Sequence, residues 1–498
     1  MTEIQSIAQG AEASALASGP GSAAPSTAAG RADGRMDRRA RLVLLILCTA
    51  NFLVGIDFSI LTIAVPAIGR DLGLGESSLQ WVATAFALPS GGLLLLFGRL
   101  GDVVGRRRVF LAGMTLFTLA SVLTALAWSP AALFTARALQ GLGAAGVVPT
   151  GMALLTTSFP EGRARDKALG IAGSLMATGF TVGTLIGGVV TDLVGWRFTM
   201  VLPIVLGLLV VAGTPVLVRE SRSTRRERLD LPGAVAVTGG LLALIYALST
   251  AAQVGWGRPS VFGTLAAGVA LLALFLLVEA RSAQPLVSLR VLRRRTVAAG
   301  NLGGLLAFAT ATAASFLGEL FLQQVNGLSP ISTGLVFGWI GVVAAVSGNL
   351  APRAIGRFGS GPVLVVGMFV QGLGTVVLAT MTRGDSVLIL LLGGSVWIYA
   401  NLHAIVGYNV TATSGLANEE QGLATGLATT TQQVGLTIGI PIMSALAAAH
   451  ANGALRAGRE RVDALADGFR WALGADAAIT VAGAALLGAL LLRRVREL

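Results

Sequence analysis

The stretch GRLGDVVGRRR, Gly98–Arg108, interrupts two apolar runs with arginines, a single acid and regularly placed glycines. Glycines 98, 101 and 105 allow two helix ends to approach closely and turn, because glycine has no Cβ. The arginines are too costly to place in hydrocarbon. We therefore predict a tight, water-exposed loop between two membrane-spanning helices, in which Asp102 caps a helix or pairs with a guanidinium across a neighbouring helix end. The alternative is an ordinary basic loop that only sets topology.

The composition agrees with a membrane protein. Apolar residues make up 54% of the chain and charged residues only 12%, and there are 66 glycines in 498 residues. This profile predicts an all-α polytopic membrane protein. The formal net charge of +12 comes mainly from arginines that cluster in short segments between apolar runs. Such clusters orient helices in a lipid bilayer and do not suggest a nucleic-acid-binding surface.

Residue types that serve catalysis or metal binding are sparse. The chain has one cysteine, Cys48, and two well-separated histidines, His403 and His450. It has no Ser-His-Asp arrangement, no HExxH motif and no phosphate-binding loop. We therefore expect no enzyme activity, metal site or cofactor, and no obligate protein partner is evident.

Apolar segments of spanning length recur along the whole chain. Their even number places both termini on one side, and the basic residues flanking the first and last segments predict that this side is the cytoplasm, as for a protein of the plasma membrane. The fourteen predicted spans are 42–68, 78–97, 109–127, 131–155, 168–190, 199–218, 232–251, 260–279, 297–323, 331–351, 362–381, 386–410, 422–449 and 472–492.

Two basic connectors divide the spans into groups of six, two and six, which predicts two pseudo-symmetric six-helix bundles with two extra central helices. Residues 1–36 are rich in Ala, Ser, Gly and Pro and are expected to form a disordered cytoplasmic tail. The expected domains are 37–228 for the first bundle, 229–285 for the central pair and 286–498 for the second bundle.

Two charged residues inside predicted spans are the strongest functional candidates. Asp57 lies in the first span and Arg137 in the fourth. An ionisable side chain at the centre of a bilayer costs at least about 2.5 kcal/mol on insertion scales, so a functional role is the default interpretation. A hydrogen-bonded structural role is the alternative for each.

Three further residues are weaker candidates for substrate binding. Glu319 lies near the outer end of the ninth span, where binding a cationic substrate and simple solvation at the interface are both open. Tyr399 and His403 are four residues apart, so they share a helix face that suits the lining of a polar cavity. A structural hydrogen bond is the alternative role for His403.

Several stretches resemble signatures of the major facilitator superfamily of transporters. Gly98–Arg108 resembles the loop between its second and third helices, which implies a conformational latch. RALQGLGAA, Arg137–Ala145, resembles the signature of its fourth helix, whose buried arginine is associated with proton coupling. IDFSILTIAVPAI, Ile56–Ile68, and FLQQVNGLSPISTGL, Phe321–Leu335, resemble patterns of its fourteen-helix drug and proton antiporter branch. The resemblance assigns the latch to Gly98, Asp102, Gly105, Arg106 and Arg107.

The stretch GFTVGTLIGG, Gly179–Gly188, resembles the so-called antiporter motif in the fifth helix. Its glycines are Gly179, Gly183, Gly187 and Gly188. Small residues at this spacing also pack helices in any membrane protein. The chain departs from the family patterns at Thr184, where proline is usual, at Thr62, where asparagine is usual, and at Glu319, where an apolar residue is expected. The first departure puts the leak-sealing role of the motif in doubt.

The resemblance implies a proton-coupled exporter of amphiphilic or aromatic small molecules, such as an antibiotic or secondary metabolite. Its expected partners are the small-molecule substrate, protons and the lipid bilayer. Asp57 and Arg137 are the expected proton-coupling residues. The alternatives are a proton-coupled metabolite importer on the same fold and, from another class, a membrane receptor or a lipid-modifying enzyme.

Overall fold

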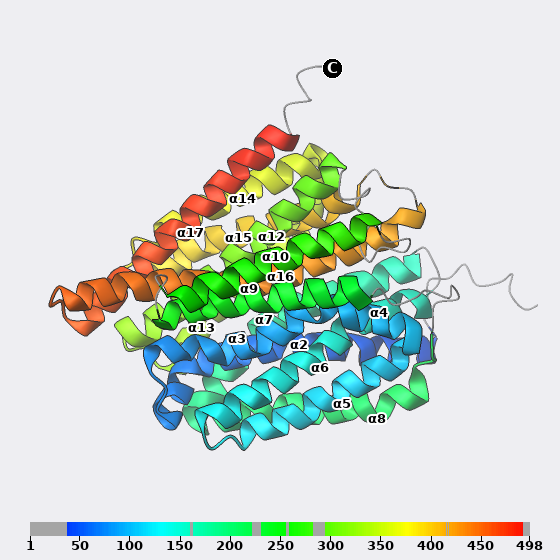
Figure 1. Ribbon diagram of the computed structural model, residues 1–498, viewed down its shortest axis with the longest axis horizontal. Coiled ribbons are helices and arrows are strands. Elements are labelled where there is room, and N and C mark those ends of the chain that lie inside the picture. The colour runs from blue at the N-terminus through cyan, green and yellow to red at the C-terminus, as the bar shows by residue number, and fades with distance from the viewer. Residues whose placement is uncertain are drawn as a thin grey trace, which may run out of the picture. The chain divides into compact units, whose positions relative to one another are not determined.

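The computed structural model describes residues 37–159, 163–221, 231–254, 258–281, 294–414, 416 and 418–491. The predicted tail 1–36 and most of the two basic connectors lie outside these ranges. Every regular element in the described ranges is a helix (Figure 1). This agrees with the all-α prediction, since long apolar segments satisfy their backbone hydrogen bonds within a helix.

The first group of helices covers the first six predicted spans. Its second span is broken: the helix axis bends by 50° between Ser78–Gly92 and Leu96–Val104. Pro89 lies inside the helix before this bend, and proline removes one backbone hydrogen bond. The elements are α2 (Arg38–Leu72), α3 (Glu76–Gly92), α4 (Leu94–Val104), α5 (Arg106–Ala125), α6 (Pro130–Ser158), α7 (Arg163–Leu193), the 3₁₀ turn η1 (Trp196–Met200) and α8 (Val201–Leu217).

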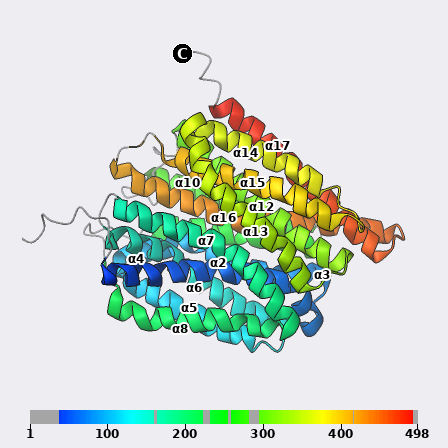
Figure 2. The same ribbon diagram turned by 180° about the vertical axis from the view of Figure 1, so that it is seen from behind.

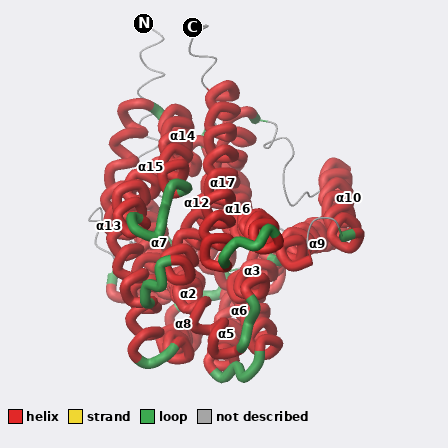
Figure 3. Tube along the Cα trace, turned by 90° about the vertical axis from the view of Figure 1, so that its left-hand side faces the viewer, coloured by secondary structure: helices red, strands yellow, loops and turns green. Residues whose placement is uncertain are grey.

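The middle pair consists of α9 (Leu231–Val254) and α10 (Pro259–Arg281). These two helices pack on each other, and α9 also packs on α3 and α16 (Asn418–Arg456). Figure 3 shows the pair standing to one side of the other helices. Most of α10 is exposed in the structure, as expected for a helix that faces lipid.

The last group of helices covers the last six predicted spans. Its first helix ends in a π-helical turn, a feature that often marks functional sites. The remaining elements are α12 (Arg295–Leu320), the π turn η2 (Phe321–Val325), α13 (Pro330–Phe358), α14 (Ser360–Leu378), α15 (Ser386–Thr413) and α17 (Arg461–Leu491).

The length and apolarity of the helices indicate how many of them can span a membrane. Within the described ranges, eleven helices are long and apolar enough to cross a membrane, and the bent pair α3 and α4 makes a twelfth. α7 and α9 contain shorter apolar stretches, Val182–Leu193 and Pro232–Ala247. A helix thus lies over each of the fourteen predicted segments, whereas the full count of fourteen spans stays a prediction.

Glycines with positive φ mark equivalent turns in the two groups. Gly73 and Gly327 follow the first helix of each group, and Gly105 and Gly359 precede the third helix. Gly73 and Gly105 are separated by the same number of residues as Gly327 and Gly359. This agreement supports an internal repeat.

The two groups pack on each other at one end, which we term the distal end and define by the α2–α3, α12–α13 and α16–α17 connections. The opposite, proximal end carries Gly105 and Gly359. One cluster of buried apolar residues at the distal end includes Ile68 on α2, Leu79 on α3, Phe321 in η2 and Phe469 on α17. We term this cluster the distal seal.

The helices α2, α7 and α13 pack side by side across the boundary between the groups, as Figure 2 also shows. The glycines of the antiporter-type motif lie in these contacts. A Cβ on Gly179, Gly183 or Gly187 would press on α2, and a Cβ on Gly188 would lie 2.6 Å from the backbone oxygen of Pro330 on α13. The motif therefore allows close backbone approach on both sides of α7.

Substitution of Gly187 tests this close approach. An added Cβ would lie 2.8 Å from the backbone oxygen and 3.0 Å from the Cα of Ile60, so α2 and α7 would have to separate. We expect Gly187→Ala to destabilise the protein by about 1–3 kcal/mol. The measurement is thermal unfolding in detergent. The matched control is Gly474→Ala on α17, because nothing lies within 4 Å of a Cβ added at this position. Equal unfolding temperatures for the two variants would contradict the packing argument.

Candidate functional site

Asp57 on α2 and Arg137 on α6 form a buried ion pair. Arg137 Nη1 lies 2.6 Å from Asp57 Oδ2, and the two side chains are 1% and 0% exposed. A charge without a partner at this depth would cost several kcal/mol. The structure thus brings together the two residues that the sequence analysis placed in separate spans, and each supplies the counter-charge of the other.

Arg137 also ties α6 to α3. Its Nε donates a hydrogen bond to the backbone oxygen of Val82 at 3.1 Å, and its guanidinium lies 4.6 Å from the centre of the Phe86 ring. A guanidinium over an aromatic face gains electrostatic stabilisation, especially away from water. Arg137 therefore keeps contacts to α3 that do not depend on the charge of Asp57.

Gln140, one helical turn after Arg137, completes the network and was not identified from the sequence. Its Nε2 donates to Asp57 Oδ1 at 3.0 Å and to Ser121 Oγ at 2.8 Å. Its Oε1 accepts from Arg137 Nη1 at 2.9 Å and from Thr124 Oγ1 at 3.0 Å. The amide therefore uses both of its donors and accepts two bonds, which fixes its orientation.

This network joins α2, α3, α5 and α6 through side chains that are almost wholly buried. Because the partners are interdependent, a change in the charge of Asp57 alters the bonds of Arg137 and Gln140 together. The network therefore links the charge of Asp57 to the packing of four helices.

The second group of helices holds a related network without charges. Gln371 on α14 donates to Thr310 Oγ1 on α12 at 2.9 Å. Asn401 on α15 donates to Gln371 Oε1 at 3.2 Å and to the backbone oxygen of Ala307 at 3.3 Å. Both networks connect the first, third and fourth helices of their group, but only the first contains titratable groups.

The Gly98–Arg108 stretch differs from the predicted loop. α4 continues to Val104 and α5 begins at Arg106, so the turn is confined to Gly105, which has φ of +124°. Asp102 accepts a hydrogen bond from Arg106 Nε at 2.8 Å, one helical turn away. Its observed partner therefore lies across the Gly105 turn, at the N-terminal end of α5, as the sequence analysis predicted for a guanidinium at a neighbouring helix end.

Glu220, which follows α8, makes the connection to a neighbouring helix. Its Oε1 accepts from the backbone N–H of Arg107 at 2.9 Å, and its Oε2 lies 3.9 Å from Arg108 Nε. Arg107 Nη1 also donates to the backbone oxygen of Val218 at 3.1 Å. A Cβ on Gly105 would lie 2.9 Å from the Glu220 carboxylate, so a larger residue would obstruct this contact.

The remaining glycines of the stretch lie against α6. A Cβ on Gly101 would lie 2.6 Å from Thr150 Cγ2, and one on Gly98 would lie 3.4 Å from Pro149 Cβ. The proximal end of α4 is thus packed tightly between α6 and the α4–α5 turn. This packing explains the glycine spacing without requiring a flexible loop.

The candidate substrate-binding residues occupy different surroundings. Glu319 is 1% exposed and lies in the distal region of α12, so it is not solvated at the interface in this conformation. Tyr399 is 39% exposed and lies along the same face of α15 as the exposed Leu392 and Val396. The nearby His403 Nδ1 lies 2.9 Å from Ser347 Oγ on α13. The exposure of this face favours contact with lipid over lining of an internal cavity.

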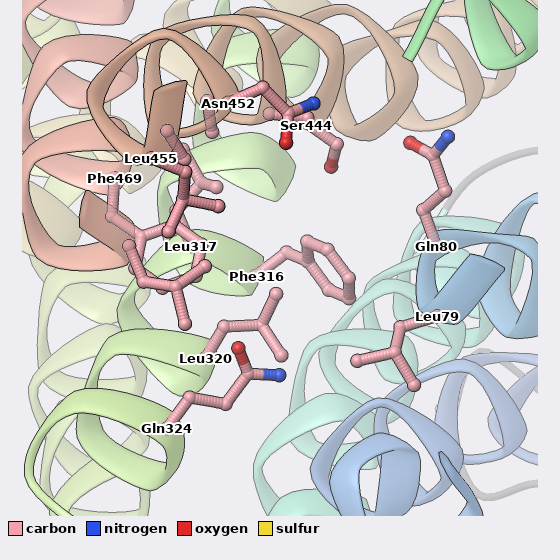
Figure 4. Close-up of a pocket in the computed structure, with 14 residues that line it drawn as sticks. Leu79, Gln80, Phe316, Leu317, Leu320, Gln324, Ser444, Asn452, Leu455 and Phe469 are labelled. Atoms are coloured by element: carbon pink, nitrogen blue, oxygen red, sulfur yellow. The ribbon is translucent and has the colours of Figure 1, made fainter. Parts of the chain in front are cut away.

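A cavity of about 90 Å³ opens at the distal end between α3, α12, α16 and α17. Figure 4 shows Phe316 between Leu317 and Leu320 on one side and Leu79 and Gln80 on the other. Sites for drug-sized molecules usually measure about 300–1,000 Å³. This cavity is therefore too small for such a ligand. Among the described residues, no group of three or more His, Cys, Asp or Glu side chains is arranged to hold a metal ion.

The stability of the protein should depend strongly on the ion pair between Asp57 and Arg137. Asp57→Leu and Arg137→Met should each destabilise the protein by about 3–5 kcal/mol, because each leaves a buried charge without its partner. The double variant should cost clearly less than the two single variants combined. Unfolding in mixed micelles measures all three. Additive effects would show that the two side chains are energetically independent.

Comparison with known proteins places the chain in a family. The family model described as Major Facilitator Superfamily matches residues 47–440. The chain is 38% identical to a cephamycin export protein of Amycolatopsis lactamdurans, over 81% of this chain and 84% of that protein. It is 36% identical to a puromycin resistance protein of Streptomyces alboniger, over 80% of each.

A solved structure shares the fold at low sequence identity. A transporter of the POT family, PepTSo, superposes with a TM-score of 0.68 at 13% identity, covering 92% of this chain and 98% of that chain. This similarity agrees with the helix packing described above. The family match covers most of the chain, from α2 to α16. This chain therefore belongs to the Major Facilitator Superfamily.

Proposed function

We propose that the protein is a proton-coupled exporter of amphiphilic or aromatic small molecules, such as an antibiotic or another secondary metabolite. Family membership and the export and resistance functions of the cephamycin and puromycin relatives support export. The observation that carries proton coupling is the buried pair of Asp57 and Arg137, because it is a titratable group held by its counter-charge between helices that must move in alternating access.

The proposed orientation places the proximal end in the cytoplasm of a cell whose plasma membrane holds the protein. The basic residues Arg106, Arg107 and Arg108 lie at this end, where the positive-inside rule expects them. The distal seal then closes the outer side. In this conformation, substrate would enter from the cytoplasm.

The chemistry at Asp57 follows from its contacts. The ionised carboxylate holds Arg137 and Gln140 through hydrogen bonds of 2.6 and 3.0 Å. Protonation removes the negative charge and weakens both bonds. Arg137 keeps its bonds to Val82 and Gln140, so α6 stays attached to α3 while its hold on α2 loosens. Each protonation state thus favours a different packing, which is the requirement for coupling.

The proximal turn supplies a second control point. Glu220 and the Arg107 backbone join the α4–α5 turn to the end of α8 in this conformation. Asp102 contributes by holding Arg106 in place through an ion pair of 2.7 Å. We propose that these contacts stabilise one of the two transport states and act as a conformational latch.

Neutralising Asp57 tests the coupling role. Asp57→Asn keeps the shape of the protonated acid and retains an oxygen that accepts a bond from Arg137. The variant should insert and fold. Its rate of proton-driven export should fall by at least about tenfold, a change that corresponds to a typical coupling free energy. The measurement is proton flux in proteoliposomes on addition of a panel that contains puromycin and a cephamycin.

The direction of transport provides the control for this assay. A pH gradient directed inward should expel the panel compound that gives flux, and an importer would accumulate it. If Asp57→Asn still drives uphill export that depends on the proton gradient, Asp57 is not the coupling acid.

Removing Glu220 tests the latch. Glu220→Ala removes the acceptor of the Arg107 N–H, so transport should fall severalfold while expression and membrane insertion persist. Asp102→Asn should act in the same direction, because it weakens the pair with Arg106. The control is Glu460→Ala, an exposed acid at the distal end. Transport at the wild-type rate in both latch variants would leave the stretch with a purely topological role.

A further inference from the structure

Glu319 is a buried acid that has no hydrogen-bond partner among the described residues. Its side chain is 1% exposed, and neither carboxylate oxygen has a hydrogen-bond partner among the described residues. Its neighbours on α12, Phe316, Leu317 and Leu320, all belong to the distal seal. The surroundings of Glu319 therefore contrast with those of Asp57, which has both a counter-charge and a hydrogen-bonding amide.

Glu319 lies in the part of α12 that is close to the boundary between the two helix groups. Gln323, four residues further along the chain, donates a hydrogen bond from Nε2 to the backbone oxygen of Ile63 on α2 at 3.1 Å. Figure 4 shows Phe316 and Leu320 of α12 approaching Leu79 of α3 across the same boundary. Separation of the groups at the distal end would therefore expose this part of α12 to water.

The charge state of Glu319 follows from this burial. Burying an ionised carboxylate that has no partner costs much more free energy than burying a protonated carboxyl. Glu319 must therefore be neutral while the distal seal is closed. By contrast, hydrogen bonds from the hydroxyl and backbone N–H of Thr382 lower the pKa of the exposed Asp385, so that acid keeps its charge.

Other ionisable groups on the helices around α12 do not alter this conclusion. None of them makes an ion pair or hydrogen bond with Glu319 within the described ranges. Asp57 is committed to Arg137, and the described part of α14 carries no ionisable side chain. The groups whose side chains are described on the remaining neighbours are Arg38, Arg39, Arg41, Cys48, Arg70 and Asp71 on α2, Tyr399, His403 and Tyr408 on α15, His450 and Arg456 on α16, and Arg461, Asp463, Asp467, Arg470 and Asp476 on α17.

We propose that Glu319 is a second proton-binding site, and that a proton taken up from the distal side allows the distal seal to close. The ionised carboxylate accepts the proton from water when the two groups are apart at this end, and the neutral carboxyl is then enclosed. Loss of the proton is possible only when water returns. This inference rests on the proposed function, because it assigns the proton a role in the same transport cycle.

Asp476 on α17 provides a matched comparison. Its side chain is 0% exposed, and both of its carboxylate oxygens also lack a hydrogen-bond partner among the described residues. However, α17 packs on α12, α14 and α16, all within the second group of helices. Opening of the distal boundary would therefore hydrate Glu319 and leave Asp476 enclosed.

The experiment measures, as a function of pH, the distance between two spin labels at the distal end, one on each helix group. Spin labels are attached to Gly75→Cys and Gly384→Cys in a Cys48→Ala background, because both glycines are exposed at the distal end and nothing lies within 4 Å of an added Cβ. The full chain is reconstituted in liposomes without substrate. We expect the distance between the labels to lengthen as the pH is raised. Glu319→Gln should keep the short distance at every pH, and Glu319→Asp and Asp476→Asn should retain the lengthening.

The outcomes separate this inference from the proposed function. A lengthening that persists in Glu319→Gln, that is abolished equally by Asp476→Asn, or that is missing in the parent protein would overturn the role of Glu319. Proton flux driven by the antibiotic panel in the unlabelled protein tests the proposed function independently. If the antibiotic panel drives proton flux but the distance between the labels does not respond to pH, the proposed function stands and the role of Glu319 is contradicted.

Discussion

The buried ion pair between Asp57 and Arg137 constrains the packing of the first helix group. Neither charge is tolerable alone at this depth, so α2 and α6 must approach within hydrogen-bonding distance. Gln140 then requires donors and acceptors from α5, and the guanidinium needs the carbonyl of Val82 on α3. Four helices are thus positioned by polar contacts with defined geometry. Apolar packing alone would permit many alternative registers, since lipid and side chains are equally apolar.

The two groups of helices share an architecture but differ in electrostatics. The network of Gln371, Thr310 and Asn401 connects the second group without any charge, so it holds helices together and has no titratable state. Two buried acids of that group, Glu319 and Asp476, are instead left without hydrogen-bond partners among the described residues. An internal repeat has therefore kept its turns and its polar cross-links, while charged residues have been placed differently in each half.

The sequence predicted the features that depend on local composition. Apolar runs placed every described helix, and the cost of burying Asp57 and Arg137 identified both members of the pair. Gln140 was missed, because a glutamine between small residues gives no local signal and its partners Ser121 and Asp57 lie on other helices. The true partner of the Gly98–Arg108 stretch, Glu220, was missed for the same reason. Which face of a helix meets lipid and which meets a neighbour is decided by tertiary packing.

On the proposed mechanism, the charges of three buried side chains balance while the distal seal is closed. With Asp57 ionised, Arg137 charged and Glu319 neutral, these three buried side chains carry no net charge, which is what a medium of low dielectric constant favours. Either change of protonation disturbs the balance: a proton on Asp57 leaves Arg137 without its counter-charge, and loss of the proton from Glu319 creates an unpaired anion. Water must reach the affected group to offset the cost. On the proposed mechanism, changes in protonation and the opening of one end of the protein are therefore linked, because each stabilises the other.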